Sequence, residues 1–327
     1  MSGLCLKARP TPAQLADRLR PIDGVWPAGL ELYLAAADLA DPADVETIVR
    51  RIQACAVPDG FAWLIEGPVD SLDGGDFDVT RDSQADRLVV LRLAELARRI
   101  GAKAVNIHVI APGEDVSRLT RRMHDELLER CVPFIREFVD LVGNAGAVPT
   151  VENMPPVLRM RRGGFSSTPI GMASQDLLWL VDQAPGLRLL PDTSHAGLYL
   201  NMRALTGRGE PSPTGGLDGP GMEHAELSTA PWLEPLLCYV RQLPDEAPDV
   251  LGYVQTLERH IANAQVSNAA GVLGEGLGYG EGEIDLDPVI AWLGRHARYL
   301  VTETLEASND DAVHMREALR RMRAVLV

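Results

Sequence analysis

The sequence predicts one α/β domain, a closed (β/α)8 or TIM barrel that spans residues 1–327. Short β-type runs alternate with helical runs from end to end, and eight of each can be counted. Strict alternation requires a parallel sheet with helices outside it. Eight units in about 300 residues favour closure into a barrel over an open, doubly wound sheet. No GxGxxG motif follows the first strand, so a dinucleotide site has no support.

The expected strands are residues 3–8, 29–36, 61–69, 103–110, 147–154, 187–195, 263–269 and 299–307. The expected helices are residues 11–19, 41–55, 84–101, 117–143, 174–184, 257–262, 285–297 and 310–326. Asp41 followed by Pro42 is typical of a helix start, and Gly101 of a helix end. We expect Pro133 to kink or break its helix. A long loop insertion rich in glycine and proline is expected at about 201–231.

The composition is that of a soluble globular protein, with 46% apolar and 24% charged residues. No apolar run is long enough to cross a membrane, and the start of the chain has no extended apolar stretch. We therefore expect a cytoplasmic protein with no membrane partner. The four cysteines are far apart and form no CxxC pair, which favours free thiols. The net charge of −15 repels polyanions and argues against a nucleic-acid partner.

Polar side chains stand at the ends of five expected strands, where catalytic residues lie in barrels of this kind. These strand ends are Ile107-His108, Val151-Glu152-Asn153, Pro191-Asp192-Thr193-Ser194-His195, Ala264-Gln265-Val266-Ser267-Asn268 and Val301-Thr302-Glu303. Side chains alternate along a strand, so Val148, Thr150 and Glu152 share one face. An inward acid at that place is a buried charge that needs a positive partner.

Several acids that converge on one barrel axis repel one another. Either their pKa values rise or a cation lies between them. Carboxylates and an amide oxygen are hard ligands, which suits Mn²⁺ or Mg²⁺, with Co²⁺ or Zn²⁺ as alternatives. A salt bridge or a loop cap would explain any single acid, but acids at successive strand ends favour one divalent metal ion.

The order and spacing of these motifs resemble the xylose-isomerase-like TIM-barrel superfamily, which includes sugar isomerases, epimerases and the family 2 AP endonucleases. The motifs are ENM at 152–154, D-x-x-H at 192–195, Q-x-x-N at 265–268, GEGEID at 280–285 and the late glutamate at 303. The resemblance spans most of the chain. It implies that the metal ligands are Glu152, Asp192, Gln265 and Glu303, with Gln265 where many members have histidine.

The resemblance further implies an isomerase or epimerase of a sugar, or of a sugar-like hydroxy-ketone, that depends on this metal. Glu152 and Glu303 would act as base and acid across the substrate carbon, through a cis-enediolate. His195 would donate a hydrogen bond to a substrate oxygen. The full set of expected substrate-binding residues is His195, His108, Glu66, Arg162 and Asn268. The expected partner is a small carbohydrate-like molecule, and the resemblance also allows a homodimer.

Three other functions stay open at this stage. A dehydratase of a polyhydroxylated ring, of the inosose or dehydroshikimate type, would use the same metal and expel water. An arginine such as Arg162 would then pair with a substrate carboxylate or phosphate. An endonuclease IV-like phosphodiesterase would need more histidines around a zinc cluster, and Glu66 stands where one is expected. A non-catalytic ligand-binding barrel would have no need of the acids.

Overall fold

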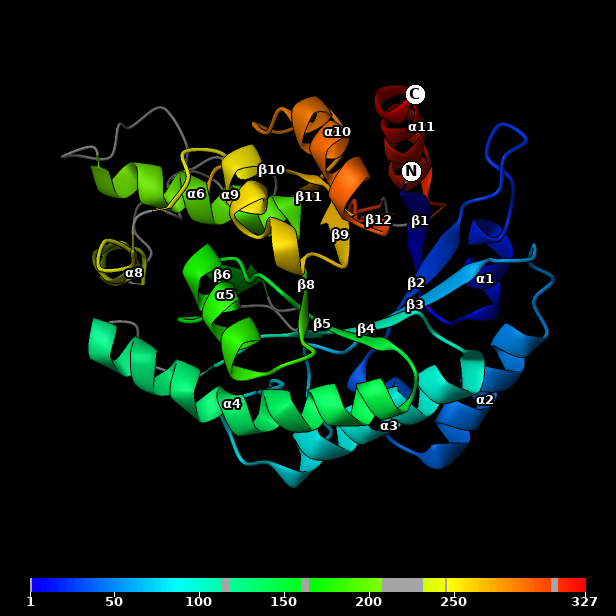
Figure 1. Cartoon of the computed structure of the whole chain (residues 1–327), viewed down its shortest axis with the longest axis horizontal. Coiled ribbons are helices and arrows are strands. Elements are labelled where there is room, and N and C mark those ends of the chain that lie inside the picture. Colours follow the sequence, from blue (N-terminus) through cyan, green and yellow to red (C-terminus); the bar gives the residue numbers. More distant parts are fainter. Residues whose placement is uncertain (1, 113–117, 160–164, 208–231, 245, 307–310) are drawn as a thin grey trace.

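The computed structural model describes residues 2–112, 118–159, 165–207, 232–244, 246–306 and 311–327. In these residues, eight parallel strands form one sheet in the order β8-β5-β4-β3-β2-β1-β12-β9. They are β1 (Gly3–Ala8), β2 (Gly29–Tyr33), β3 (Ala62–Glu66), β4 (Ala104–His108), β5 (Val148–Glu152), β8 (Arg188–Leu190), β9 (Asn263–Val266) and β12 (Tyr299–Thr302). The sheet curls into a ring with the helices outside it (Figure 1).

The two edge strands, β8 and β9, meet along a seam that nearly closes the barrel. Across it, Ala262 N–H donates to Leu189 O at 2.9 Å, and Gln265 N–H donates to Pro191 O at 3.0 Å. An isolated parallel bridge pairs Asp192 with Gln265 at the end of the seam. The predicted (β/α)8 barrel is therefore confirmed.

Helices follow the strands along the outside of the barrel. They are α1 (Pro12–Arg18), α2 (Pro42–Gln53), α3 (Gln84–Ile100), α4 (Arg121–Asn144), α5 (Ser174–Gln183), α6 (Thr193–Gly207), α8 (Leu233–Val240), α9 (Val250–Thr256), α10 (Leu286–His296) and α11 (Val313–Leu326). The Asp41 carboxylate caps α2 by accepting from Ala43 N–H at 2.7 Å, a contact of about 1 kcal/mol. Gly101 ends α3 with a φ of 65°, in the left-handed region that glycine adopts without strain.

Two sequence predictions about helices differ from the structure. Residues 201–207, expected to begin a long loop insertion, belong to α6 instead, which continues to Gly207; the rest of the expected insertion, 208–231, lies outside the described part of the chain. Of the kink or break expected at Pro133, the break is absent, since α4 continues through the proline as a single helix of 24 residues; the kink stays a prediction. Cys131, Phe134 and Ile135 beside the proline are buried. Burial of this apolar face offsets the missing backbone hydrogen bond.

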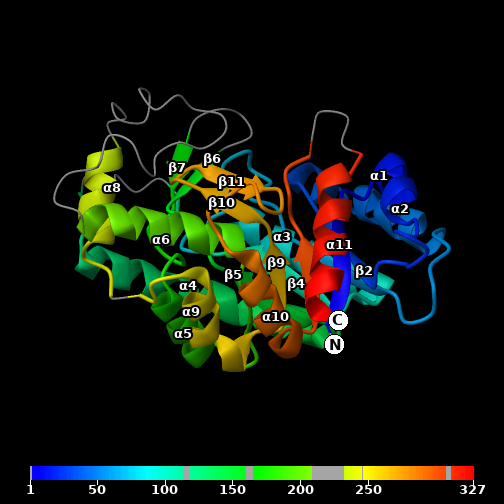
Figure 2. The ribbon, with the colours of Figure 1, turned by 90° about the horizontal axis from the view of Figure 1, so that it is seen from above.

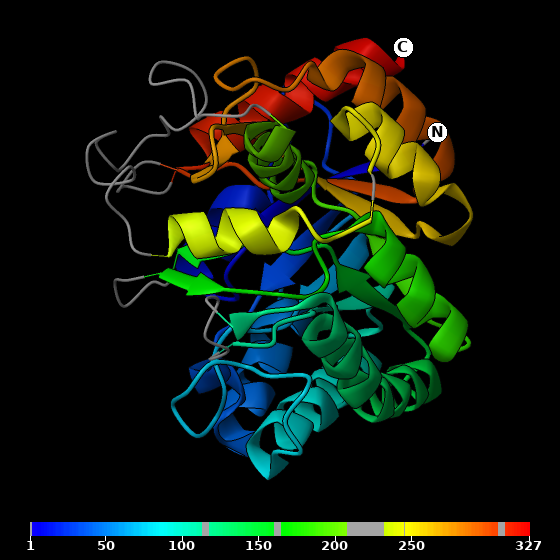
Figure 3. The same ribbon diagram turned by 90° about the vertical axis from the view of Figure 1, so that its left-hand side faces the viewer.

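Two hairpins outside the barrel sheet follow the carboxyl ends of β5 and β9. β6 (Val157–Arg159) pairs with β7 (Phe165–Ser167), and β10 (Asn268–Ala270) pairs with β11 (Gly274–Leu277). Both hairpins stand at the same end of the barrel (Figures 2 and 3). This end is where the side chains that follow the strands converge.

The inner face of the barrel changes from apolar to charged along the strands. Cys5, Leu64, Ala104 and Val301 form a small apolar cluster. The residues two positions further along each strand lie on the same face. They are Lys7 on β1, Glu66 on β3, Asn106 on β4 and, just after β12, Glu303. The apolar cluster thus lies under a charged layer at the carboxyl end.

All four cysteines are free, as the sequence predicts. In the described ranges, no helix combines the length and the apolar character that crossing a bilayer demands.

Candidate active site

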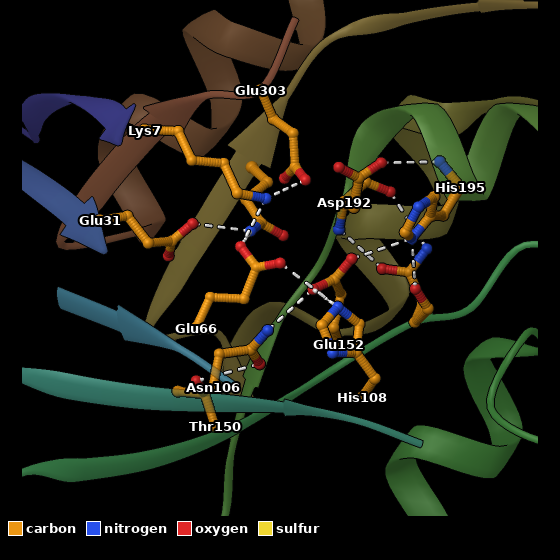
Figure 4. Close-up of polar contacts among 12 residues, drawn as sticks. Lys7, Glu31, Glu66, Asn106, His108, Thr150, Glu152, Asp192, His195 and Glu303 are labelled. Carbon is orange, nitrogen blue, oxygen red and sulfur yellow. Dashed lines mark hydrogen bonds and ion pairs between the residues drawn. The ribbon is translucent and has the colours of Figure 1, made fainter. Parts of the chain in front are cut away.

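A cavity of about 720 Å³ opens at the carboxyl end of the barrel. Its polar lining includes Lys7, Arg9, Tyr33, Glu66, His108, Asp192, His195, Ser267, Glu275 and Glu303. Figure 4 shows Glu66, Asp192 and Glu303 from this lining, together with Glu31 and Glu152, directed toward one another. The cavity therefore lies beside most of the residues that the sequence singles out.

Glu152 is the last residue of β5 and is fully buried. Asn106 on the neighbouring strand donates from Nδ2 to Glu152 Oε2 at 2.8 Å. Its other oxygen, Oε1, lies 2.9 Å from His195 Nδ1. Thr150, one inward position earlier, donates to Val105 O at 3.2 Å, which satisfies its buried hydroxyl. Glu152 is thus fixed from two sides.

Asp192 is positioned by the turn from β8 into α6. Pro191 has no N–H to donate, so it joins the sheet only through its carbonyl, which accepts from Gln265 N–H. Asn153 supports the turn: its Oδ1 accepts from Asp192 N–H at 2.7 Å, and its Nδ2 donates to Asp192 O at 3.1 Å. Asp192 Oδ1 in turn accepts from His195 N–H at 2.7 Å. Burial raises the pKa of Asp192 to about 6, with His195 opposing the rise and Glu152 adding to it.

His195, on the first turn of α6, contacts acids through both ring nitrogens. Nδ1 lies 2.9 Å from Asn153 O and 2.9 Å from Glu152 Oε1. Both atoms are acceptors, so Nδ1 carries the proton. Nε2 lies 3.2 Å from Glu275 Oε1. Burial disfavours the imidazolium, but the carboxylates around it, Asp192 first, outweigh burial and raise the pKa of His195.

His108 and Glu66 are also brought into the cluster. His108 Nε2 lies 3.4 Å from Glu66 Oε1 and 3.6 Å from Glu152 Oε2. Burial opposes ionisation of Glu66, but Lys7 and His108 together outweigh it and lower its pKa to about 2. Glu66 is therefore a charged carboxylate at neutral pH.

Lys7 and Glu31 belong to the site, although the sequence analysis did not single them out. Lys7 Nζ lies 2.5 Å from Glu66 Oε2 and contacts Glu303 Oε1. One oxygen each of Glu31, Glu66 and Glu303 falls within 4.8 Å of the others. A signal was present in the sequence, because strands of a parallel barrel are covered on both faces and are normally apolar. A lysine or glutamate inside such a run marks an inward polar position.

Gln265 lies at the centre of this cluster with its side chain fully buried. Its Nε2 donates to Glu31 Oε2 at 2.7 Å and to Glu66 Oε2 at 3.0 Å. Within the described residues, Gln265 Oε1 and Glu303 Oε2 are shielded from solvent and have no hydrogen-bond partner. Buried oxygens without partners are costly, and a cation is one way to satisfy them.

Two of the predicted substrate-binding residues are not among the described residues that line the cavity. Asn268 Oδ1 accepts from Ala269 N–H and Ile284 N–H at 2.9 Å each, and its Nδ2 donates to Ile284 O at 3.0 Å. Its side chain therefore holds the loop after β9, and Ser267 lines the cavity in its place. Arg162 lies outside the described residues.

Three groups of side chains have ligand atoms close enough together to bind a metal ion. They are Glu66–His108–Glu152, Glu152–Asp192–His195 and Glu31–Glu66–Glu303. Glu152 is shared by two groups. The third is in contact with the Lys7 ammonium. The donor set, rich in carboxylates with two imidazoles, fits a divalent cation such as Mn²⁺, Mg²⁺, Co²⁺ or Zn²⁺.

No protein-family model and no curated protein matches the chain. Solved structures match over nearly its whole length. A D-tagatose 3-epimerase-like protein has 15% identity and a TM-score of 0.62, covering 99% of this chain and 98% of that one. A 3-keto-D-glucoside 4-epimerase from E. coli has 12% identity and a TM-score of 0.60, covering 99% and 100%. An endonuclease IV from Thermus thermophilus has 15% identity and a TM-score of 0.56, covering 99% and 98%.

At these identities the likeness establishes the fold. The resemblance to xylose-isomerase-like barrels, inferred from short motifs, is confirmed at that level.

Proposed function

We propose that this protein is a divalent-metal-dependent isomerase or epimerase of a sugar or a sugar-like hydroxy-ketone. The observation that carries the proposal is the convergence of five acids at the cavity end of one barrel. They are Glu31, Glu66, Glu152, Asp192 and Glu303. The epimerases among the structures of similar fold support the same class of substrate.

The residues that would hold the metal are Glu152, Asp192, Gln265 and Glu303. Asp192 and Glu152 are positioned by their neighbours without any ligand, and Gln265 and Glu303 each keep one buried oxygen without a partner among the described residues. A divalent ion bound there would polarise a substrate carbonyl and acidify the adjacent C–H. The carboxylate-rich donor set favours Mn²⁺ or Mg²⁺.

The protein's own side chains would transfer the proton and stabilise the charge that develops. Glu303 lines the cavity and would exchange a proton with the substrate carbon from one side. Glu152 would do so from the other side, since β8 and β9 separate its strand from β12. The protonated His195 would donate to the substrate oxygen on which negative charge develops. Return of the proton to the neighbouring carbon gives isomerisation, and return to the opposite face gives epimerisation.

A screen in D₂O tests the reaction class. Ketoses, inososes and dehydroshikimate would each be incubated with the protein and Mn²⁺, Mg²⁺ or Co²⁺. We expect solvent deuterium in the recovered sugar and in its isomer, without loss of water. A new ultraviolet absorbance, from an enone formed from an inosose or from the aromatic ring formed from dehydroshikimate, would instead establish the dehydratase and contradict our proposal.

Substitution of the two glutamates tests their roles. Glu303→Gln is expected to lower kcat by about 10²-fold or more, the usual effect of losing a general acid or base. Glu152→Gln is expected to lose both activity and bound metal, measured by elemental analysis. Glu95→Gln on the outside of α3, where the carboxylate only pairs with Arg99 at 3.8 Å, is the control. Unchanged deuterium exchange in Glu303→Gln would remove this glutamate from the mechanism.

A further inference from the structure

Four neighbouring strands bring one ammonium and three carboxylates together in the barrel interior. The strand order is β12-β1-β2-β3, and Lys7 pairs in register with Glu31 across β1 and β2. Leu6 pairs with Thr302, so Glu303 follows at the level of Lys7. Figure 4 shows the Lys7 side chain reaching in between Glu66 and Glu303. The placement is set by the barrel itself and does not depend on a surface loop.

These three carboxylates lie close enough together to bind one cation. Their oxygens lie within 4.8 Å of one another, and the Lys7 ammonium is in contact with two of them. Without a positive charge between them, such buried acids would repel strongly or take up protons. Lys7 is only 9% exposed, so its ammonium interacts with these carboxylates and little with solvent.

Gln265 is a fourth polar side chain in contact with this cluster. Gln265 is fully buried, and its Nε2 donates to two of the same acids, whereas its Oε1 has no partner among the described residues. The amide presents its hydrogens because both acids are acceptors. Three carboxylates offer a donor set that suits Mn²⁺ or Mg²⁺.

The choice of lysine at this position is unusual for this chain. Of its 31 basic residues other than histidine, only Lys7 and Lys103 are lysines. An ammonium is a compact point charge, whereas a guanidinium is a flat fork that needs more room. Only the compact group can take the place of a metal ion between three carboxylates.

We propose that the Lys7 ammonium substitutes for a second divalent cation at Glu31, Glu66 and Glu303. The barrel face then has two cation positions: one is filled permanently by the chain's own side chain, and the other, on the Glu152–Asp192 side, is left for a metal ion. The metal ion on the Glu152–Asp192 side rests on the proposed function. The substitution of Lys7 for a cation does not depend on it.

The test measures how many Mn²⁺ ions each protein binds. Wild type, Lys7→Met and the control Lys103→Met would be titrated with MnCl₂ by isothermal calorimetry, and the bound metal counted by elemental analysis after dialysis. Methionine matches the length of the lysine stem and removes the charge. Lys103 is exposed just before β4. We expect Lys7→Met to bind one more Mn²⁺ per chain than wild type, and Lys103→Met to bind the same number.

Because Lys7→Met leaves buried acids unopposed, its thermal stability would be followed as MnCl₂ is added. We expect a low Tm without metal and a rise on addition that exceeds the rise in wild type. A Lys7→Met protein that binds no extra ion, or that stays unfolded in millimolar MnCl₂, overturns the proposal. Wild type that binds no Mn²⁺ would count against the proposed function instead, since the comparison with Lys7→Met still tests the lysine.

Discussion

Asp192 is held in place by hydrogen bonds that exist before any ligand arrives. Asn153 makes two hydrogen bonds to its backbone, and its carboxylate accepts a hydrogen bond from His195 N–H. Burial nevertheless disfavours its charge and raises its pKa to about 6. The same residue is thus rigid in geometry and titratable near neutral pH. A cation that binds to it must displace a proton whenever the pH is below that value.

This residue therefore predicts a pH dependence of metal affinity. Below about pH 6 each unit of acidification should weaken Mn²⁺ binding roughly tenfold, because the proton and the metal compete for one carboxylate. Well above that pH the contribution of Asp192 to the affinity should be constant. Calorimetric titrations with MnCl₂ between about pH 5 and pH 8 would measure it. Affinity that stays level through the acid range would show that Asp192 is not a ligand.

The sign for stability follows from the same pKa. A carboxyl group whose pKa is raised on folding binds its proton more tightly in the folded chain. Its favourable contribution is complete below the unfolded pKa and is lost as the pH rises through about 6. Removal of metal should therefore cost more stability at pH 8 than at pH 5.

The sequence predicted this part of the site because its residues stand at the ends of recognisable strands. Glu152 and Asp192 each follow an apolar run, and the alternation of side chains assigns them to the interior. Lys7 and Glu31 were not predicted because they lie inside their strands, where only the fact that both faces of the strand are covered marks a polar residue as inward. Their proximity to Glu303 arises only when the barrel closes, which brings the first strand beside the last.

At the scale of helices, a buried histidine joins α4 to α5. His124 is completely buried, and its Nε2 lies 3.0 Å from Asp176 Oδ1 while Nδ1 lies 3.0 Å from Asp125 Oδ1. Asp176 also accepts from Gly171 N–H at 3.0 Å, ahead of α5. Burial opposes the imidazolium, but Asp176 and Asp125 outweigh burial and the repulsion of Arg121, and raise the pKa of His124.

His124→Gln should accordingly destabilise the fold more in acid than in base. A histidine with a raised folded pKa contributes stability that is full below the unfolded value of about 6.5 and is lost as the pH rises through the folded value. We expect a loss of about 1–3 kcal/mol near pH 5.5, typical of a buried polar contact, and a smaller loss near pH 8.5. Urea unfolding of both proteins measures this, with His260→Gln as control on a partly exposed histidine. An equal loss at both pH values would refute the charged pair.

Helix boundaries were predictable where a local signal sets them, and not elsewhere. The Asp41 cap and Gly101 mark α2 and α3 to within a residue or two. By contrast, α6 runs seven residues into the segment expected to be a loop. Leu198, Tyr199 and Met202 on this helix are buried, and α6 packs against the β10–β11 hairpin and α8. Tertiary packing therefore extends the helix beyond what its own sequence indicates.

For the whole molecule, the decisive feature is the seam between β8 and β9. Pro191 contributes only an acceptor there, so Gln265 N–H and Ala262 N–H make the backbone hydrogen bonds across it. Asp192 and Gln265, two of the proposed ligands, come from opposite sides of this seam and form its terminal bridge. A metal ion bound to both would link the two edges of the sheet, so closure of the barrel and metal binding would stabilise each other.

Hydrogen exchange would detect this coupling. If the seam opens only after the metal leaves, free Mn²⁺ at 100 times its Kd should slow exchange of the Gln265 and Ala262 amides by about 100-fold. The Lys103 N–H, which donates to Trp63 O at 2.8 Å between β3 and β4, lies away from the seam and should change less. In Asp192→Asn the extra protection should disappear, because one edge loses its charged ligand. Equal slowing of all three amides would mean that the metal stabilises the barrel globally, with no special role for the seam.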